Sequence, residues 1–379
     1  MPTRTGQERV AALTCFSCGL SHDPTRLNNV CQRCGLPLKV DVILPEGAAP
    51  SIIDVDIGSM WRYSAVLPVA RASSVSLGEG WTPIIQVEED VWLKDESGNP
   101  AGSFKSRGMS MAVSAAVLLG AEHLVVPTAG FAGAALAAYG AEAGLPVTIA
   151  MPRDTPSAIV DECLSNGAKV HLVDGTIADA GRWLAENRED GEFDVSTLKE
   201  PYRVEGKKTM GYELFEQFGF ALPDVVIYPT GGGTGLVGMW KAWDEMEQMG
   251  WIEGARPRLV CVQSSGCAPI VEAHGRGAHS TRPWPNPVTK AYGLRVPAPI
   301  GGFLCLTALD ETEGTAVSVP DSVILDTMEE MAAATGLDMC PEGGAAWAAY
   351  RELAASGWIE PGETVVVWNT GSGKSYRPL

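Results

Sequence analysis

The feature that most constrains the fold is an alternation of short apolar runs with longer stretches rich in Ala and Leu. Apolar runs at 124–126 and 147–151 are each followed by a stretch of helical character, at 132–143 and 157–167. An order of strand, helix, strand, helix is typical of βα units, which build mostly parallel sheets. The sequence therefore predicts an α/β fold. Further strand-like runs lie at 169–173, 224–228, 259–263 and 364–368.

The first 45 residues differ from the rest, because they hold four of the nine cysteines as two C-x-x-C-G pairs. The pairs are Cys15 with Cys18, and Cys31 with Cys34. Each pair forms a tight knuckle, and two knuckles can close a tetrahedral zinc site that stabilises a segment too short for its own core. The sequence predicts a structural zinc ribbon. The alternative is a ribbon that keeps its shape without metal.

Charge and hydropathy exclude several classes of partner. The chain has 28 Lys and Arg against 46 Asp and Glu, a net charge of −18, and its densest basic run is Lys207-Lys208. Such a chain repels nucleic acid and anionic membranes. The longest uncharged run, 124–141, contains a proline and three glycines, so it is not expected to span a membrane. The polar residues 1–10 lack the apolar core of a signal peptide, so we expect a cytoplasmic protein with reduced thiols.

Two glycine motifs imitate nucleotide-binding sites. Residues 233–238 match G-x-G-x-x-G, but Gln263-Ser264-Ser265 stands at the end of the next strand, where a ribose-binding carboxylate is needed. Gly373-Lys374-Ser375 resembles the end of a P-loop, but Trp368 replaces the required first glycine and only four residues follow. We therefore expect neither NAD nor ATP.

The remaining glycine cluster is the segment Thr230-Gly231-Gly232-Gly233-Thr234-Gly235, between a strand and a helix. Consecutive glycines let backbone N–H groups converge, and the helix N-terminus adds positive potential. The segment is predicted to hold one phosphate group. The alternative is a tight βα turn without a ligand.

Lys105 stands where a helix is expected to open, near Arg107. An ammonium group at a helix N-terminus meets unfavourable positive potential, so its pKa should fall. A lysine of lowered pKa is suited to Schiff-base chemistry. The alternative is a solvated lysine at the start of a helix.

Several motifs carry a family resemblance. The N-P-x-G-S-F-K segment that ends at Lys105, the later G-G-G-T-G and a C-terminal T-G-S-G resemble the fold-type-II pyridoxal-phosphate enzymes, and more specifically the threonine synthases. Segments at 78–83, 200–209 and 341–346 are similar to the G-E-G-x-T-P, P-Y-R-x-E-G-x-K-T and P-E-G-A-A motifs of that family. The motifs occur in family order over nearly the whole chain.

The resemblance implies a zinc-ribbon-like segment at 1–46 and two mostly parallel-sheet domains. The large cofactor-binding domain would be discontinuous, 47–110 and 200–379, and the small domain would be 111–199. The implied cofactors are pyridoxal 5'-phosphate and structural Zn²⁺, and the implied assembly is a homodimer that acts on a small amino-acid substrate.

The resemblance also assigns roles to residues. Lys105 would carry the cofactor as a Schiff base and move protons. Thr370, or as second choice Ser372, would face the pyridine nitrogen through a neutral hydroxyl, which favours elimination and replacement over transamination. The cofactor phosphate would lie on Gly231, Gly232, Gly233, Thr234 and Gly235. The substrate would be bound by Thr128, Ala129, Gly130, Ala132 and Arg203.

The sequence departs from the family at three places. Phe131 replaces an asparagine that would donate a hydrogen bond to the 3′ oxygen of the cofactor. Ala132, Thr197 and Leu198 replace polar residues of the substrate-phosphate site. Lys374 lies one residue earlier than the family lysine.

The leading expectation is therefore a pyridoxal-phosphate-dependent lyase that makes threonine from O-phosphohomoserine. One alternative is a diverged β- or γ-replacement or elimination enzyme acting on another amino acid in a specialised pathway. The other is a non-catalytic binding protein of the same fold.

Overall fold

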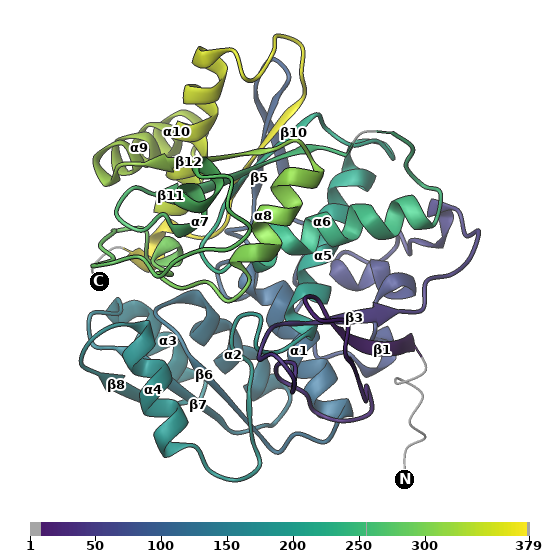
Figure 1. The fold of residues 1–379 in the computed structure, drawn as a ribbon, viewed down its shortest axis with the longest axis vertical. Helices are drawn as coiled ribbons and strands as arrows, with labels where there is room; N and C mark the ends of the chain where they lie inside the picture. Colours follow the sequence, from purple (N-terminus) through teal and green to yellow (C-terminus); the bar gives the residue numbers. More distant parts are fainter. Residues whose placement is uncertain (1–8, 255, 377–379) are drawn as a thin grey trace.

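The computed structural model describes residues 9–254 and 256–376, and within them the chain forms three sheets flanked by helices (Figure 1). Most of the N-terminal segment that is expected to lack a signal peptide, residues 1–8, lies outside the described residues. None of the described helices combines the length and the apolar character that a membrane span needs. The α/β fold expected from the sequence is confirmed.

The largest sheet has six strands in the order β12-β11-β10-β13-β5-β4. Neighbouring strands are parallel except β4 and β5, which form an antiparallel pair at one edge. Its strands are β4 (Ile84–Glu88), β5 (Val91–Asp95), β10 (Val225–Pro229), β11 (Arg258–Ser264), β12 (Thr315–Val319) and β13 (Val365–Asn369). The runs at 224–228, 259–263 and 364–368 thus form β10, β11 and β13, as expected.

Helices cover both faces of this sheet, which is why its central strands are continuously apolar. One face packs against α5 (Tyr202–Gln217), α6 (Thr234–Gln248), α7 (Pro269–Gly275) and α8 (Gly302–Glu311). The other face packs against α9 (Asp321–Thr335) and α10 (Pro341–Ser356).

The second sheet has four parallel strands in the order β8-β7-β6-β9. They are β6 (His123–Pro127), β7 (Val147–Pro152), β8 (Lys169–Val173) and β9 (Glu192–Asp194). The helices α1 (Lys105–Leu118), α2 (Phe131–Glu142) and α3 (Ser157–Ser165) contribute to the core on one face, and α4 (Ile177–Asn187) packs on the other. The uncharged run 124–141 is therefore a strand, a loop and a helix.

The third sheet is a small antiparallel ribbon with the order β2-β1-β3. Its strands are β1 (Val10–Cys15), β2 (Ser21–His22) and β3 (Leu38–Val42). Leu13 and Val40 pack with Met111 of α1 and Tyr202 of α5. The ribbon, purple in Figure 1, therefore lies on the helices that lead into the larger sheets. Short 3₁₀ helices complete the described structure: η2 (Pro50–Ile52), η3 (Met60–Val66), η4 (Arg71–Ser73), η5 (Tyr292–Leu294) and η6 (Gly373–Tyr376).

A buried ion network positions the start of α1. Arg107 donates to Glu96 at 2.8 Å and to Glu213 at 2.7 Å, and Lys94 pairs with Glu213 at 2.5 Å. All four side chains are inaccessible to solvent. Lys94 lies on β5 and Glu96 directly follows it, whereas Arg107 lies on α1 and Glu213 on α5. The network therefore ties the first turn of α1 to the large sheet.

Candidate active site

A pocket lies between the segments that follow the carboxyl ends of β6 in the four-stranded sheet and β10 in the six-stranded sheet. Open α/β sheets bind ligands at such ends, where loops and helix N-termini converge. The pocket receives residues from several segments that are far apart in the sequence. Its lining includes Phe104, Lys105, 128–132, Ile177, Thr197, 228–235, 292–296, Glu342, Thr370 and Tyr376.

Lys105 is the first residue of α1, two residues earlier than the helix start expected from the sequence. Its side chain is half-buried because it faces the pocket, with Nζ 3.7 Å from the ring centroid of Phe104. Desolvation by the surrounding protein, and next the charge of Arg203, lower the pKa of Lys105 to about 7. The expected lowering is therefore confirmed, but burial is its largest cause. A substantial neutral fraction of this amine is available near neutral pH.

The glycine segment forms the turn between β10 and α6, where its backbone closely approaches other loops. Gly233 has a φ of +89°, a backbone conformation that residues other than glycine rarely adopt. A Cβ added to Gly231 would lie 2.1 Å from the carbonyl oxygen of Gly293. The positions therefore require glycine, and the turn presents backbone to the pocket as the sequence predicts for a phosphate cradle.

Thr370 and Ser372, the two hydroxyl candidates, lie in different surroundings. Thr370 follows β13 and lines the pocket, with its Oγ1 3.8 Å from Sγ of Cys340. Burial raises the pKa of the Cys340 thiol, so this neighbour stays neutral. Ser372 instead hydrogen-bonds to Asp338 and is not among the described lining residues. The geometry favours Thr370 over Ser372 as the group that faces a ligand.

The segment 128–132 runs from the end of β6 into the first residues of α2, and all five of its residues line the pocket. Thr128 Oγ1 accepts a hydrogen bond from the backbone N–H of Gly130 at 3.2 Å. Because α2 begins at Phe131, the first N–H groups of this helix have no partner within the helix and can bind an anion.

Phe131 forms part of an aromatic wall together with Tyr376 and Tyr292. Its ring meets Tyr376 edge-on at a centroid distance of 5.7 Å, and Tyr376 stacks on Tyr292 at 6.0 Å. Tyr376 donates a 2.6 Å hydrogen bond to Oε1 of Glu342, which also accepts from the backbone of Gly293 at 2.7 Å. Tyr292, Glu342 and Tyr376 were not expected in the pocket from the sequence, although Glu342 lies in the motif at 341–346 and Tyr376 directly follows Gly373-Lys374-Ser375.

Arg203 lies at the second residue of α5, behind the described lining of the pocket. It is 1% exposed, and its Nη1 donates to the carbonyl of Val195 at 2.9 Å. Within the described residues, its Nε and Nη2 are buried without a hydrogen-bond partner. A buried guanidinium with free donors is suited to an anionic partner. Of the replaced residues of the expected substrate-phosphate site, Ala132 and Thr197 line the pocket and Leu198 does not.

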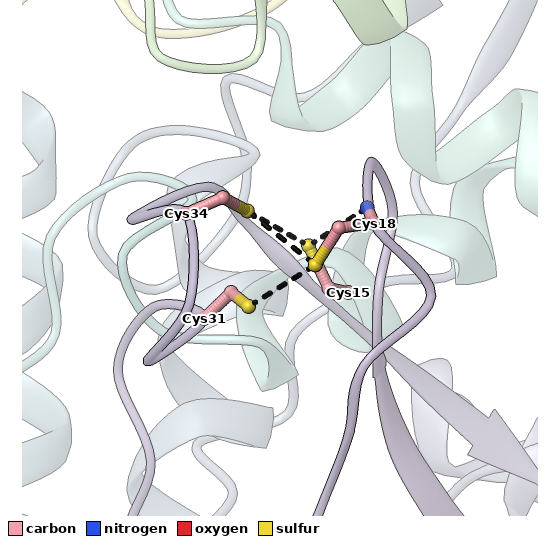
Figure 2. A group of neighbouring side chains, drawn as sticks. All are labelled: Cys15, Cys18, Cys31 and Cys34. Carbon is pink, nitrogen blue, oxygen red and sulfur yellow. Dashed lines mark hydrogen bonds between the residues drawn. The ribbon is translucent and has the colours of Figure 1, made fainter.

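The four ribbon cysteines converge as their spacing predicts (Figure 2). All four Sγ atoms lie within 4.8 Å of one another, with Cys15 and Cys34 3.4 Å apart and Cys18 and Cys31 3.6 Å apart. Four sulfurs at a zinc–sulfur distance of about 2.3 Å would be about 3.8 Å apart. The arrangement therefore fits a tetrahedral zinc ion with no open position.

Comparison with known proteins adds an independent finding. Residues 75–371 match the model of the family described as pyridoxal-phosphate dependent enzyme. The chain is 32% identical to the threonine synthase of Methanosarcina acetivorans and 30% identical to that of Methanocaldococcus jannaschii, each over 95% of this chain and 91% of the relative. A solved structure of maize serine racemase, at 23% identity, covers 77% of this chain and 88% of its own with a TM-score of 0.65.

The pocket fits pyridoxal phosphate on its own geometry. Its described lining contains one lysine, Lys105, whose pKa of about 7 leaves the amine able to react with an aldehyde. The turn at 231–235 exposes backbone that a Cβ would obstruct. The amine and the cradle line the same pocket, as a cofactor with an aldehyde and a phosphate requires.

Proposed function

Because the chain belongs to the family of pyridoxal-phosphate dependent enzymes, we propose that it is a threonine-synthase-like lyase acting on a phosphorylated or otherwise activated amino acid. The observation that carries the proposal is the presence of Lys105 and the glycine turn in one pocket. The reaction proposed first converts O-phosphohomoserine and water to threonine and inorganic phosphate.

The cofactor, when bound, supplies an electron sink that makes the hydrogens on Cα and Cβ of an amino acid removable. Lys105 would accept and return these protons, since its pKa of about 7 allows both protonation states near neutrality. The N–H groups of the 128–132 loop would hold the substrate carboxylate. The neutral hydroxyl of Thr370 would face the pyridine nitrogen without adding charge there.

Arg203 is the proposed electrostatic partner of the leaving phosphate. Its guanidinium is close enough to Lys105 to lower the pKa of that amine, and two of its nitrogens have no hydrogen-bond partner within the described chain. An anion bound near Arg203 would offset its positive charge at Lys105 and would accept hydrogen bonds from its two free nitrogens. This role requires the guanidinium to reach the substrate from behind the pocket lining.

A diverged replacement or elimination reaction is the second candidate, and Phe131 is the observation that favours it. The wall of Phe131, Tyr376 and Tyr292 offers apolar ring surface where the resemblance expects a hydrogen-bonding amide. Such a wall suits an apolar substrate portion or the edge of the cofactor ring. The leaving group and the nucleophile then differ from those of threonine synthesis.

A substrate screen tests these proposals. The protein, incubated with pyridoxal phosphate and freed of excess, would be given O-phosphohomoserine, O-phosphoserine and related O-activated amino acids, with phosphate release and product mass as readouts. At least one should be turned over, and Lys105→Ala should abolish that turnover. No turnover of any of them by the cofactor-bound wild type would overturn the lyase proposal and favour a binding protein.

We also propose structural zinc on Cys15, Cys18, Cys31 and Cys34, and a homodimer in the cytoplasm. The proposed domains are 1–46, then 47–110 together with 200–379, and 111–199. The separate six-stranded and four-stranded sheets support the division between the last two. The net charge of −18 supports a small-molecule substrate and no nucleic-acid partner.

A further inference from the structure

One side chain of the cysteine ribbon reaches the segment that ends at the pocket. Asn29 lies between the two knuckles, and its Nδ2 donates to the carbonyl of Asp194 at 2.6 Å and to the carbonyl of Lys199 at 2.9 Å. A carboxamide nitrogen has two hydrogens, and both are used here. A single amide therefore joins the two ends of the segment 194–199, about 165 to 170 residues away in sequence.

The segment between these two carbonyls holds a strained residue. Leu198 has a φ of +56°, a backbone conformation that residues other than glycine rarely adopt. Its side chain packs so closely on Gly301 that a Cβ there would lie 2.1 Å from Cδ1 of Leu198. Backbone of this kind persists only where several contacts hold it, and the two hydrogen bonds from Asn29 are among those contacts.

The same segment supplies two contacts to the candidate active site. Thr197 lines the pocket, and its Cγ2 would lie 2.7 Å from a Cβ added to Gly232 in the glycine turn. Val195 accepts the 2.9 Å hydrogen bond from Nη1 of Arg203. Because the other two Arg203 nitrogens have no partner in the described structure, Val195 is the hydrogen-bonding group that directs this guanidinium.

We propose that Asn29 is a positioning residue that connects the cysteine ribbon to the part of the pocket that Thr197 lines and that Arg203 backs. Its two hydrogen bonds fix both ends of 194–199. They thereby keep the side chain of Thr197 packed on the glycine turn and keep the Val195 carbonyl in place to accept from Arg203. The proposal rests on the proposed function for the identity of the pocket, but not on any particular substrate. It makes the ribbon a part of the active-site architecture in addition to a stabilising element.

Asn28 provides a matched control one residue away. Both asparagines are half-buried, but Nδ2 of Asn28 donates only to the carbonyls of Asp23 and Arg26, both at 2.8 Å and both within the ribbon. The variants Asn29→Ala and Asn28→Ala therefore remove the same groups and differ in whether the bridge to 194–199 is lost. Asn29→Asp and Asn28→Asp form a second pair of unchanged volume, in which the carboxylate cannot donate to a carbonyl.

Hydrogen exchange on the cofactor-bound protein without substrate gives the first readout. In the Asn29 variants, the amides of 195–199 should exchange about tenfold faster or more, since their protection depends on the held segment. The Asn28 variants should match the wild type in this segment. Equal exchange of 195–199 in the wild type and both Asn29 variants, or equal acceleration in the Asn28 variants, would overturn the proposal.

Kinetics on whichever amino acid the enzyme turns over give the second readout. Displacement of Thr197 and Arg203 should raise KM by about fivefold or more in Asn29→Ala while kcat stays within about twofold. A general loss of folded protein would lower the amount of active enzyme and leave KM unchanged. If no amino acid is turned over, the proposed function fails, and the exchange comparison still decides the role of Asn29.

Discussion

The ring of Phe131 lies edge-on to the ring of Tyr376, with centroids 5.7 Å apart. Tyr376 is held from both sides, because it stacks on Tyr292 and donates its hydroxyl to Glu342. Phe131 is therefore packed into a fixed aromatic wall, at the position where the family resemblance expects an amide. The contact shows that the substitution is accommodated by neighbouring side chains from the C-terminal segment and the 292–296 loop.

The first prediction concerns Phe131, which stands where the family resemblance expects the side-chain amide of an asparagine. A hydrogen bond to a charged oxygen contributes about 1.5–3 kcal/mol, so Phe131→Asn should raise kcat/KM for O-phosphohomoserine by roughly tenfold or more. Phe131→Leu, which offers no donor, should give no gain. Steady-state phosphate release measures both. A wild type that already reaches about 10⁴ M⁻¹s⁻¹, with no gain in Phe131→Asn, would identify an ordinary threonine synthase.

The second prediction identifies the cofactor lysine. The cofactor-bound protein should be yellow, with absorption at roughly 410–430 nm, and Lys105→Ala should be colourless. Borohydride reduction and peptide mapping should place the adduct on Lys105. Lys207 is the relevant competitor, because its Nζ lies 3.5 Å from the same Phe104 ring. An adduct on Lys207 would refute the assignment.

The third prediction concerns pH. Only the neutral amine attacks the aldehyde, so the rate of cofactor attachment should rise with pH through the Lys105 pKa of about 7 and level off above it. Arg203→Met removes a charge that lowers this pKa, so the midpoint should move to higher pH, whereas Arg203→Lys should leave it nearly unchanged. Absorbance against pH measures the midpoint. A wild-type rate that keeps rising toward 10.5, the ordinary lysine value, would contradict the prediction.

The fourth prediction concerns the ribbon. Elemental analysis should find about one zinc per chain, and replacing Cys31 and Cys34 by serine should remove it and lower Tm. Cys163→Ala, which alters a cysteine outside the ribbon, should retain the metal. Metal-free wild-type protein with the Tm of the zinc-bound form would show that the ribbon needs no zinc.

The fifth prediction concerns the buried ion network. Arg107→Met would leave Glu96 and Glu213 buried without their guanidinium partner, and should reduce the free energy of unfolding by about 3–5 kcal/mol. Arg351→Met breaks a surface pair with Glu330 and should cost less than about 1 kcal/mol. Urea denaturation measures both. Equal losses in the two variants would show that Arg107 contributes no more than a surface ion pair.

The same network predicts acid sensitivity. Burial alone would raise the pKa of Glu96, but the Arg107 charge reverses that effect, so the pKa is lowered from 4.5. A carboxyl group whose pKa is lowered on folding stabilises the protein above its unfolded pKa and loses this contribution as pH falls. Unfolding free energy of the wild type should therefore decrease below about pH 4.5, and decrease less in Arg107→Met.

Features carried by local spacing could be derived from the sequence alone. Alternating apolar runs predicted the α/β class, and paired cysteines predicted the four-thiol cluster. The segments around Lys105 and 230–235 predicted a helix-start lysine and a glycine turn, which the structure brings to one pocket. Each depends on residues a few positions apart, whose relative placement follows from the geometry of a turn, strand or helix start.

The tertiary structure decided which distant residues meet at the pocket and around it. The charge of Arg203 acts on Lys105, the ring of Tyr376 packs against Phe131, and Asn29 donates to both ends of 194–199. These interactions join parts of the chain that are far apart in the sequence. The sequence offered Thr370 first and Ser372 second, and packing places Thr370 at the pocket and Ser372 against Asp338. Even the low pKa of Lys105 depends first on burial, which arises when separate elements pack together and exclude water from the amine.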